Sequence, residues 1–99
     1  MLSISTKKNE NGLEVALIGE VDVYSVDMLK EKVQQMPEEA MEEIVFNLEK
    51  LDYIDSTGLG ALIGVKKKYP QATIRVVDMK SNVARLFDIT GLNKIFVIE

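Results

Sequence analysis

Residues 53–64 read YIDSTGLGALIG, and they place an acid, a serine and three glycines directly after a strand-like run. Hydrophobic side chains then recur at helical spacing until Pro70, which cannot continue a helix. Lysines at 66–68 stand where the negative end of a helix dipole favours them. We therefore predict a strand that leads through the acid and the serine into a helix over about 57–69.

Upstream of this junction the sequence predicts a hairpin and a first helix. Apolar residues alternate or run at 2–6 and 13–18, and the turn signature NENG lies between these segments. The segment 25–36 then carries apolar residues at helical spacing, and its first residue, Ser25, is able to cap the start.

From residue 44 onward, predicted strands and helices alternate on both sides of the junction. IVFNL at 44–48 is short, branched and nearly all apolar, which is typical of a central strand covered on both faces. TIRVV at 73–77 predicts another strand, a third helix runs from Ser81 as its cap to Gly91 as its stop, and 94–98 predicts a last strand. The apolar side chains of the third helix are Val83, Leu86, Phe87 and Ile89. This alternation predicts one α/β domain over residues 1–99, a mixed β-sheet covered by helices.

The composition excludes several classes of function. The 99 residues include no Cys and no His, so the chain lacks a thiol nucleophile, the usual metal ligand and the usual neutral-pH base, and we expect no metal, cofactor or enzymatic turnover. The net charge of −4 argues against nucleic acid and favours a protein partner, because phosphate backbones are bound chiefly by clustered Lys and Arg. No apolar run approaches the roughly 20 residues that span a bilayer, and the start has no signal-peptide pattern. We therefore expect a cytoplasmic protein without membrane contact.

The DSTGLG motif has four possible interpretations. A nucleophile elbow needs GxSxG and a histidine, but Ile54 stands two residues before Ser56 and the chain has no His. A dinucleotide loop needs GxGxxG, whereas Gly58, Gly60 and Gly64 are spaced GxGxxxG inside the helical pattern. Two interpretations remain, and they can coexist. Ser56 caps the helix while the glycines let it lie close to the sheet, or Ser56 accepts a phosphate from another protein's kinase at the helix N-terminus.

Acidic residues accompany this serine. Asp52 and Asp55 precede it, and Asp22 lies after the second predicted strand, at the sheet edge where ligands gather beyond strand C-termini. A phosphate carries about −1.5 to −2 charges at pH 7, so beside carboxylates it would change the surface sharply and act as a switch. Turn chemistry and capping explain the aspartates equally well, above all Asp22.

Three segments together resemble one family. GEVDVYS at 19–25, FNLEKLDYIDSTGLGALIG at 46–64 and VARLFDITGLNKIFVI at 83–98 are similar to the STAS (sulfate transporter and anti-sigma antagonist) domain of bacterial anti-sigma factor antagonists. The similarity covers nearly the whole chain, and DSTGLG after a strand is a fairly specific signature. GEVDVYS together with DSTGLG looks most like the general-stress members of Gram-positive bacteria.

The resemblance implies partner switching in transcription regulation. Such antagonists bind an anti-sigma factor that is itself an ATP-dependent serine kinase with a histidine-kinase-like ATPase fold, and this binding releases the sigma factor in stress response or sporulation. Phosphorylation of the antagonist reverses the switch, and a PP2C-type phosphatase resets it. By resemblance Ser56 is the phosphoacceptor, with Thr57 as the secondary candidate.

The resemblance also implies a surface for this kinase. Asp22 and Asp55 would pair with its Lys or Arg, while Gly58 and Gly60 allow close approach. Tyr24 would add apolar contact, whereas Leu59 is expected in the core. The predicted partner-binding residues are Asp22, Tyr24, Asp55, Ser56, Thr57, Gly58 and Gly60.

Two departures from the family pattern lead to further expectations. Members usually continue past the last strand into a C-terminal helix, whereas this sequence ends at Glu99, and the segment between its second helix and next strand is short. We therefore predict exposed apolar surface or a strand edge, and weak self-association. The alternative function is a STAS domain that senses a nucleotide or small ligand, or a regulatory fragment of a larger protein such as a transporter.

Overall fold

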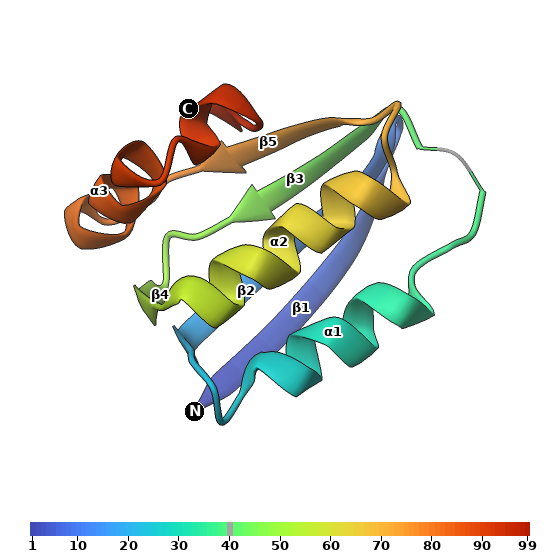
Figure 1. Ribbon diagram of the computed structural model, residues 1–99. Helices are drawn as coiled ribbons and strands as arrows, with labels where there is room; N and C mark the ends of the chain where they lie inside the picture. The colour runs from blue at the N-terminus through green and yellow to red at the C-terminus, as the bar shows by residue number, and fades with distance from the viewer. Residues whose placement is uncertain (40) are drawn as a thin grey trace.

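The computed structural model describes residues 1–39 and 41–99, and it shows one mixed sheet with three α-helices (Figure 1). The strands are β1 (Leu2–Asn9), β2 (Gly12–Val21), β3 (Glu43–Asn47), β4 (Leu51–Ile54), β5 (Thr73–Val77) and β6 (Val97–Ile98). The helices are α1 (Val26–Gln35), α2 (Ser56–Lys68) and α3 (Ser81–Ile89), with a 3₁₀ turn η1 (Leu92–Lys94). The predicted hairpin, helices and α/β class are confirmed.

Two strands, β3 and β4, pair with successive parts of β2. Its strand order is β1-β2-β3-β5-β6, β1 is antiparallel to β2, and the other pairs are parallel. β3 pairs with residues 12–16 of β2, and β4 pairs with residues 19–21 farther along the same strand. The register shifts at Gly19, whose φ of 104° is readily adopted only by glycine. The pairing of Val21 with Ile54 makes β2 and β4 end together, which positions the candidate site.

One face of the sheet carries the core. Ile44 pairs with Leu13 and with Ile74, and Phe46 pairs with Val15 and with Val76, so these buried side chains share a face. The buried side chains of all three helices belong to the same cluster. α1 and α2 lie side by side across this face (Figure 1).

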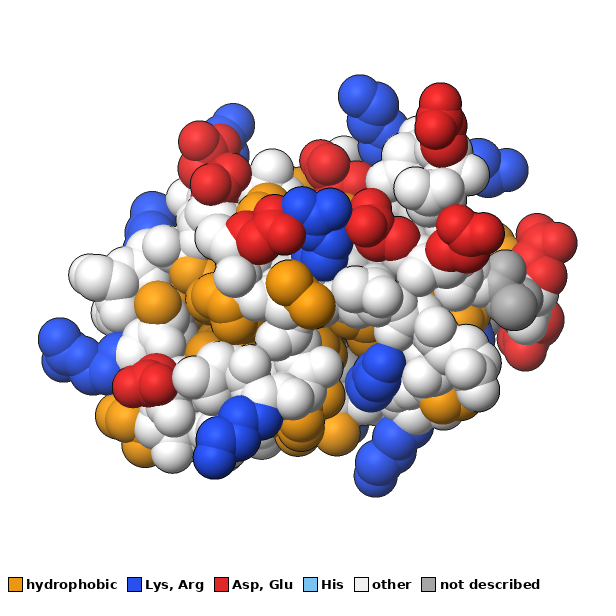
Figure 2. Space-filling view, turned by 90° about the horizontal axis from the view of Figure 1, so that it is seen from above, with side chains coloured by type: hydrophobic (Ala, Val, Ile, Leu, Met, Phe, Trp, Pro, Cys, Tyr) orange, Lys and Arg blue, Asp and Glu red, His pale blue; other side chains and the backbone are white. Residues whose placement is uncertain are grey.

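The opposite face of the sheet remains open. Val45, Asn47 and Arg75 point away from the core and are only partly buried. The predicted central position of 44–48 is confirmed, but the prediction that this strand is covered on both faces is wrong, because all three helices pack on one side. Arg75 pairs with Glu43 and Glu99 across the sheet. Seen from above, hydrophobic side chains reach the surface beside a row of acidic and basic side chains (Figure 2).

The predicted N-caps of α1 and α3 differ from the structure: α3 begins at the residue that was predicted to cap it, and the N-cap residue of α1 makes no capping hydrogen bond. Ser81 is the first residue of α3, with Lys80 at the N-cap position, so Ser81 does not cap. Ser25 stands at the N-cap position of α1, but its side chain makes no capping hydrogen bond. Its hydroxyl instead bonds backward along the chain, because the turn before α1 supplies nearer partners.

The C-terminal segment is less regular than predicted. Gly91 adopts φ 77° after α3, which confirms it as the helix stop. The predicted strand over 94–98 shortens to β6, because η1 occupies the start of this segment. Ile89 is 71 % exposed, since it lies two residues after the buried Phe87 and therefore on the other side of the helix.

Candidate functional site

The N-terminus of α2 is capped by Asp55. This residue is extended, with φ −109° and ψ −175°, and its Oδ1 accepts hydrogen bonds from the N–H groups of Thr57 at 3.0 Å and Gly58 at 3.1 Å. The interpretation of Ser56 as the cap is therefore wrong, because Ser56 already has its place inside the first turn of α2.

The two candidate acceptor hydroxyls differ in their hydrogen bonds. The side chains of Ser56 and Thr57 both lie in exposed residues. The Thr57 hydroxyl donates to Asp55 Oδ1 at 2.5 Å. Among residues 1–39 and 41–99, no group hydrogen bonds to the Ser56 hydroxyl, in contrast to the Thr57 hydroxyl.

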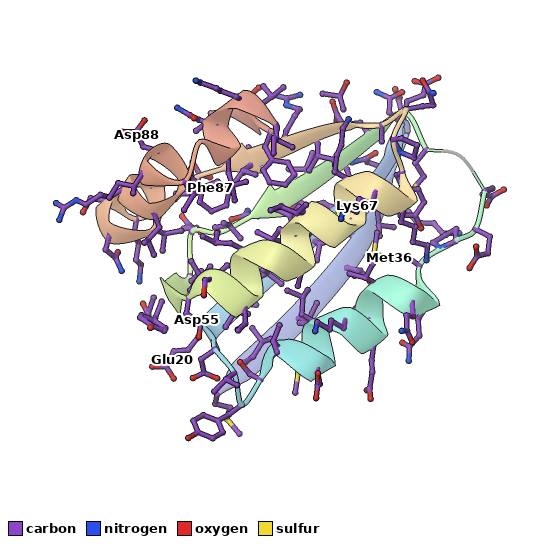
Figure 3. All side chains as sticks on the ribbon, in the orientation of Figure 1. Glu20, Met36, Asp55, Lys67, Phe87 and Asp88 are labelled. Carbon is purple, nitrogen blue, oxygen red and sulfur yellow. The ribbon has the colours of Figure 1, made fainter. Side chains whose placement is uncertain are left out.

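Asp55 places a stable negative charge beside Ser56. The Thr57 hydroxyl is the largest cause that lowers the pKa of Asp55, and the backbone N–H groups of Gly58, Thr57 and Val23 act in the same direction against the opposing effect of burial. The carboxyl group is thus ionised at neutral pH. Figure 3 shows Asp55 at the same end of the molecule as Glu20 of β2.

The structure brings Asp22 to this end as well. The Asp55 N–H donates to the carbonyl of Val21, the last residue of β2, at 3.1 Å, so the start of α2 lies beside the turn that follows this strand. Asp22 begins that turn, as the strand-end argument predicted. Asp52 lies apart on β4, where it pairs with Lys80 and its carbonyl accepts from Asn82 of α3.

Exposed apolar side chains surround the same end. Tyr24 is 94 % exposed, and Leu59 is buried in the core as expected. The sequence argument missed three further exposed residues, namely Val23, Met28 and Tyr53. Two sequence signals could have revealed part of this exposure: Met28 lies off the apolar stripe that Val26 and Leu29 begin, and Val23 lies in the turn before the helix.

The glycines of α2 have different surroundings. A Cβ on Gly58 would lie 2.6 Å from Ile54 Cγ1 and 2.7 Å from Val21 Cγ1, so close packing on the sheet requires glycine there. Nothing lies within 4 Å of a Cβ built on Gly60 or Gly64. The expected close approach to the sheet therefore holds for Gly58 alone, and Gly60 faces outward.

The described part of the chain shows neither a cluster of metal-binding side chains nor a membrane-spanning helix. Over residues 1–39 and 41–99, no three acidic, His or Cys side chains are grouped to hold a metal ion. In the same residues, no helix has the length and apolar character needed to cross a membrane.

Comparisons with known proteins identify the fold and the relatives. The family model described as the STAS domain matches residues 3–99. The anti-sigma-B factor antagonist of Bacillus subtilis (strain 168) is 36 % identical over 100 residues, which cover 99 % of this chain and 91 % of that protein.

Solved structures agree in fold. An anti-sigma factor antagonist from Mycobacterium paratuberculosis superposes with a TM-score of 0.89 at 20 % identity, over 99 % of this chain and 85 % of that one. The Bacillus cell fate determinant SpoIIAA in its phosphorylated form gives a TM-score of 0.71 at 18 % identity, over 98 % and 91 % of the two chains.

Proposed function

This chain belongs to the STAS domain family, and on that premise we propose that it is an anti-sigma factor antagonist controlled by phosphorylation of Ser56. The observation that carries the proposal is the exposed hydroxyl of Ser56 at the first position of α2, to which no other described residue hydrogen bonds. It is supported by the similarity of nearly the whole chain to the anti-sigma-B factor antagonist of Bacillus subtilis. The unphosphorylated protein binds an anti-sigma factor serine kinase, which then releases its sigma factor. The protein acts in the cytoplasm as a regulator and kinase substrate.

The kinase supplies the chemistry of the switch. Its base accepts the proton of the Ser56 hydroxyl, the oxygen forms a bond to the γ-phosphorus of ATP, and the bond to the β-phosphate oxygen breaks to release ADP. A PP2C-type phosphatase hydrolyses the phosphoserine and restores the binding form. The antagonist itself only presents the hydroxyl.

Hydrogen bonding favours Ser56 over Thr57 as the acceptor. To accept a phosphate, Thr57 would have to give up its bond to Asp55, which is the bond that contributes most to the low pKa of that carboxyl. Transfer to Thr57 would also place a dianion against the capping carboxylate. Transfer to Ser56 leaves the cap of α2 intact.

Phosphate on Ser56 weakens kinase binding by charge and desolvation. It adds about −1.5 to −2 charges on a surface that already holds the ionised Asp55 and the nearby Asp22. In a closed interface, that charge must find new donors or lose its hydration without compensation. The phosphorylated antagonist therefore releases the kinase.

Phosphate mapping tests the acceptor assignment. The wild-type chain, Ser56→Ala and Thr57→Val are incubated with the serine-kinase anti-sigma factor of the source organism and ATP, and the phosphorylated residue is located by mass spectrometry. We expect one phosphate on Ser56 in the wild type and in Thr57→Val, and none in Ser56→Ala. A wild-type phosphate on Thr57 alone would overturn the assignment.

A further inference from the structure

The carboxylate of Asp22 is used inside its own turn. Its Oδ1 accepts from the N–H of Tyr24 at 3.0 Å, the N–H of Ser25 at 3.1 Å and the hydroxyl of Ser25 at 3.1 Å. The Ser25 hydroxyl oxygen accepts from the Asp22 N–H at 3.0 Å and lies 3.0 Å from the Glu20 carbonyl oxygen, to which it can also donate. These bonds close the turn between β2 and α1 in both directions.

The closed turn holds two apolar side chains in solvent. Val23 is 61 % exposed and Tyr24 is 94 % exposed, and the two residues are called the apolar tip below. Met28, in the first turn of α1, is 49 % exposed. Adjacent exposed apolar side chains at the border of a regulated site are typical of a protein contact.

We propose that the apolar tip inserts into an apolar pocket with a basic rim on the anti-sigma factor, and that Asp22 is a positioning residue, which fixes the tip through hydrogen bonds. This inference rests on the proposed function and adds the part of the surface that supplies affinity. Ser56 then controls whether binding occurs, while the tip and its turn determine how tightly the partner is held.

Charge around the tip indicates the rim of the partner's pocket. Residues 9–29 contain no Lys or Arg. Glu20 and Asp27 flank the tip on the chain, and the Glu20 carboxylate lies 3.0 Å from the N-terminal ammonium group. Asp55 lies across from the tip, with the Val23 N–H among the groups that lower the pKa of Asp55. An acidic rim around an apolar centre complements a pocket lined by apolar side chains and edged by Lys or Arg.

The two roles available to Asp22 predict opposite results for two variants. If Asp22 pairs with a cation of the partner, removal of its charge weakens binding and loss of the Ser25 hydroxyl does not. If Asp22 positions the tip, the amide oxygen of Asp22→Asn keeps the three internal hydrogen bonds, whereas Ser25→Ala breaks the turn with the charge in place.

The test is a calorimetric titration of unphosphorylated variants against the serine-kinase anti-sigma factor of the source organism, with ADP and Mg²⁺. We expect Tyr24→Ala to weaken binding about thirtyfold, as for a central aromatic anchor. Asp22→Ala and Ser25→Ala should each weaken it about tenfold, whereas Asp22→Asn should recover binding to within about threefold of wild type.

Amide hydrogen exchange followed by NMR supplies a readout that needs no partner. The Tyr24 N–H, which donates to the Asp22 carboxylate, should exchange more slowly in wild type and in Asp22→Asn than in Asp22→Ala. The Ser25 N–H also donates to the Asp22 backbone carbonyl at 3.1 Å, so it should change less and serves as the reference. Weak binding by Asp22→Asn together with full binding by Ser25→Ala would overturn the positioning role, and full binding by Tyr24→Ala would overturn the apolar tip. Failure of the wild-type chain to bind would instead overturn the proposed function itself.

Discussion

Substitution of Gly58 by alanine tests the packing beneath the candidate site. The new Cβ would lie 2.6 Å from Ile54 Cγ1 and 2.7 Å from Val21 Cγ1, and both are branch atoms of fully buried side chains that cannot swing away. Overpacking of this kind costs about 1–3 kcal/mol, against a gain of about 1 kcal/mol in helix propensity. We therefore expect the free energy of unfolding of Gly58→Ala to fall by about 1 kcal/mol.

Gly60→Ala is the matched control in the same helix. Nothing lies within 4 Å of its Cβ, so only the propensity gain of about 1 kcal/mol remains. Urea unfolding at 25 °C followed by circular dichroism measures both variants, and thermal unfolding should separate their midpoints by about 10 °C for a domain of this size. If Gly58→Ala is stabilised as much as Gly60→Ala, α2 does not pack on the ends of β2 and β4 as described.

Three further predictions concern the helix ends and the open side of the sheet. Asp55→Ala should lower the free energy of unfolding by about 1 kcal/mol and Asp55→Asn by much less, because both Asp and Asn cap helices well. The pKa of Asp55 is lower in the folded protein than its ordinary value, so the ionised carboxylate stabilises the fold above that ordinary pKa, and this stabilisation is lost as the pH falls through the lowered pKa. In acid unfolding, wild type should therefore lose stability relative to Asp55→Asn below about pH 4. Gly91→Ala should lose about 1 kcal/mol in urea unfolding, since φ 77° disfavours a side chain although space is open. Sedimentation should show weak self-association that Val97→Lys reduces, because Val97 and Ile98 are 45 % and 37 % exposed at the sheet edge; a strict monomer at high concentration would contradict this.

Local patterns in the sequence predicted most of the elements. The NENG turn predicted the β1–β2 hairpin, in which Asn9 and Gly12 are paired across the two strands. Helical spacing of apolar residues located all three helices. The division of β3 from β4 was not predicted, because it depends on which half of β2 each segment pairs with. Coverage of the sheet also depends on tertiary packing, so the apolar run at 44–48 could not reveal an open face.

The candidate site was predicted in its position and revised in its chemistry. Strand ends placed Asp22, Asp55 and Ser56 at one edge, and the structure brings them together there. An N-cap residue has an extended backbone, and the structure shows that this residue is Asp55, whereas Ser56 was predicted to be the cap. The exposure of Tyr24 and the internal hydrogen bonds of Asp22 depend on the turn conformation, which composition does not encode.

The most direct measurement compares the affinity of three forms of the protein for the serine-kinase anti-sigma factor by calorimetric titration with ADP and Mg²⁺. The forms are the unphosphorylated wild type, wild type phosphorylated on Ser56, and Ser56→Ala. We expect the phosphorylated form to bind about a hundredfold more weakly, which corresponds to about 3 kcal/mol for an uncompensated charge in the interface, and Ser56→Ala to bind like the unphosphorylated wild type. Equal affinities for the phosphorylated and unphosphorylated proteins would contradict the switch.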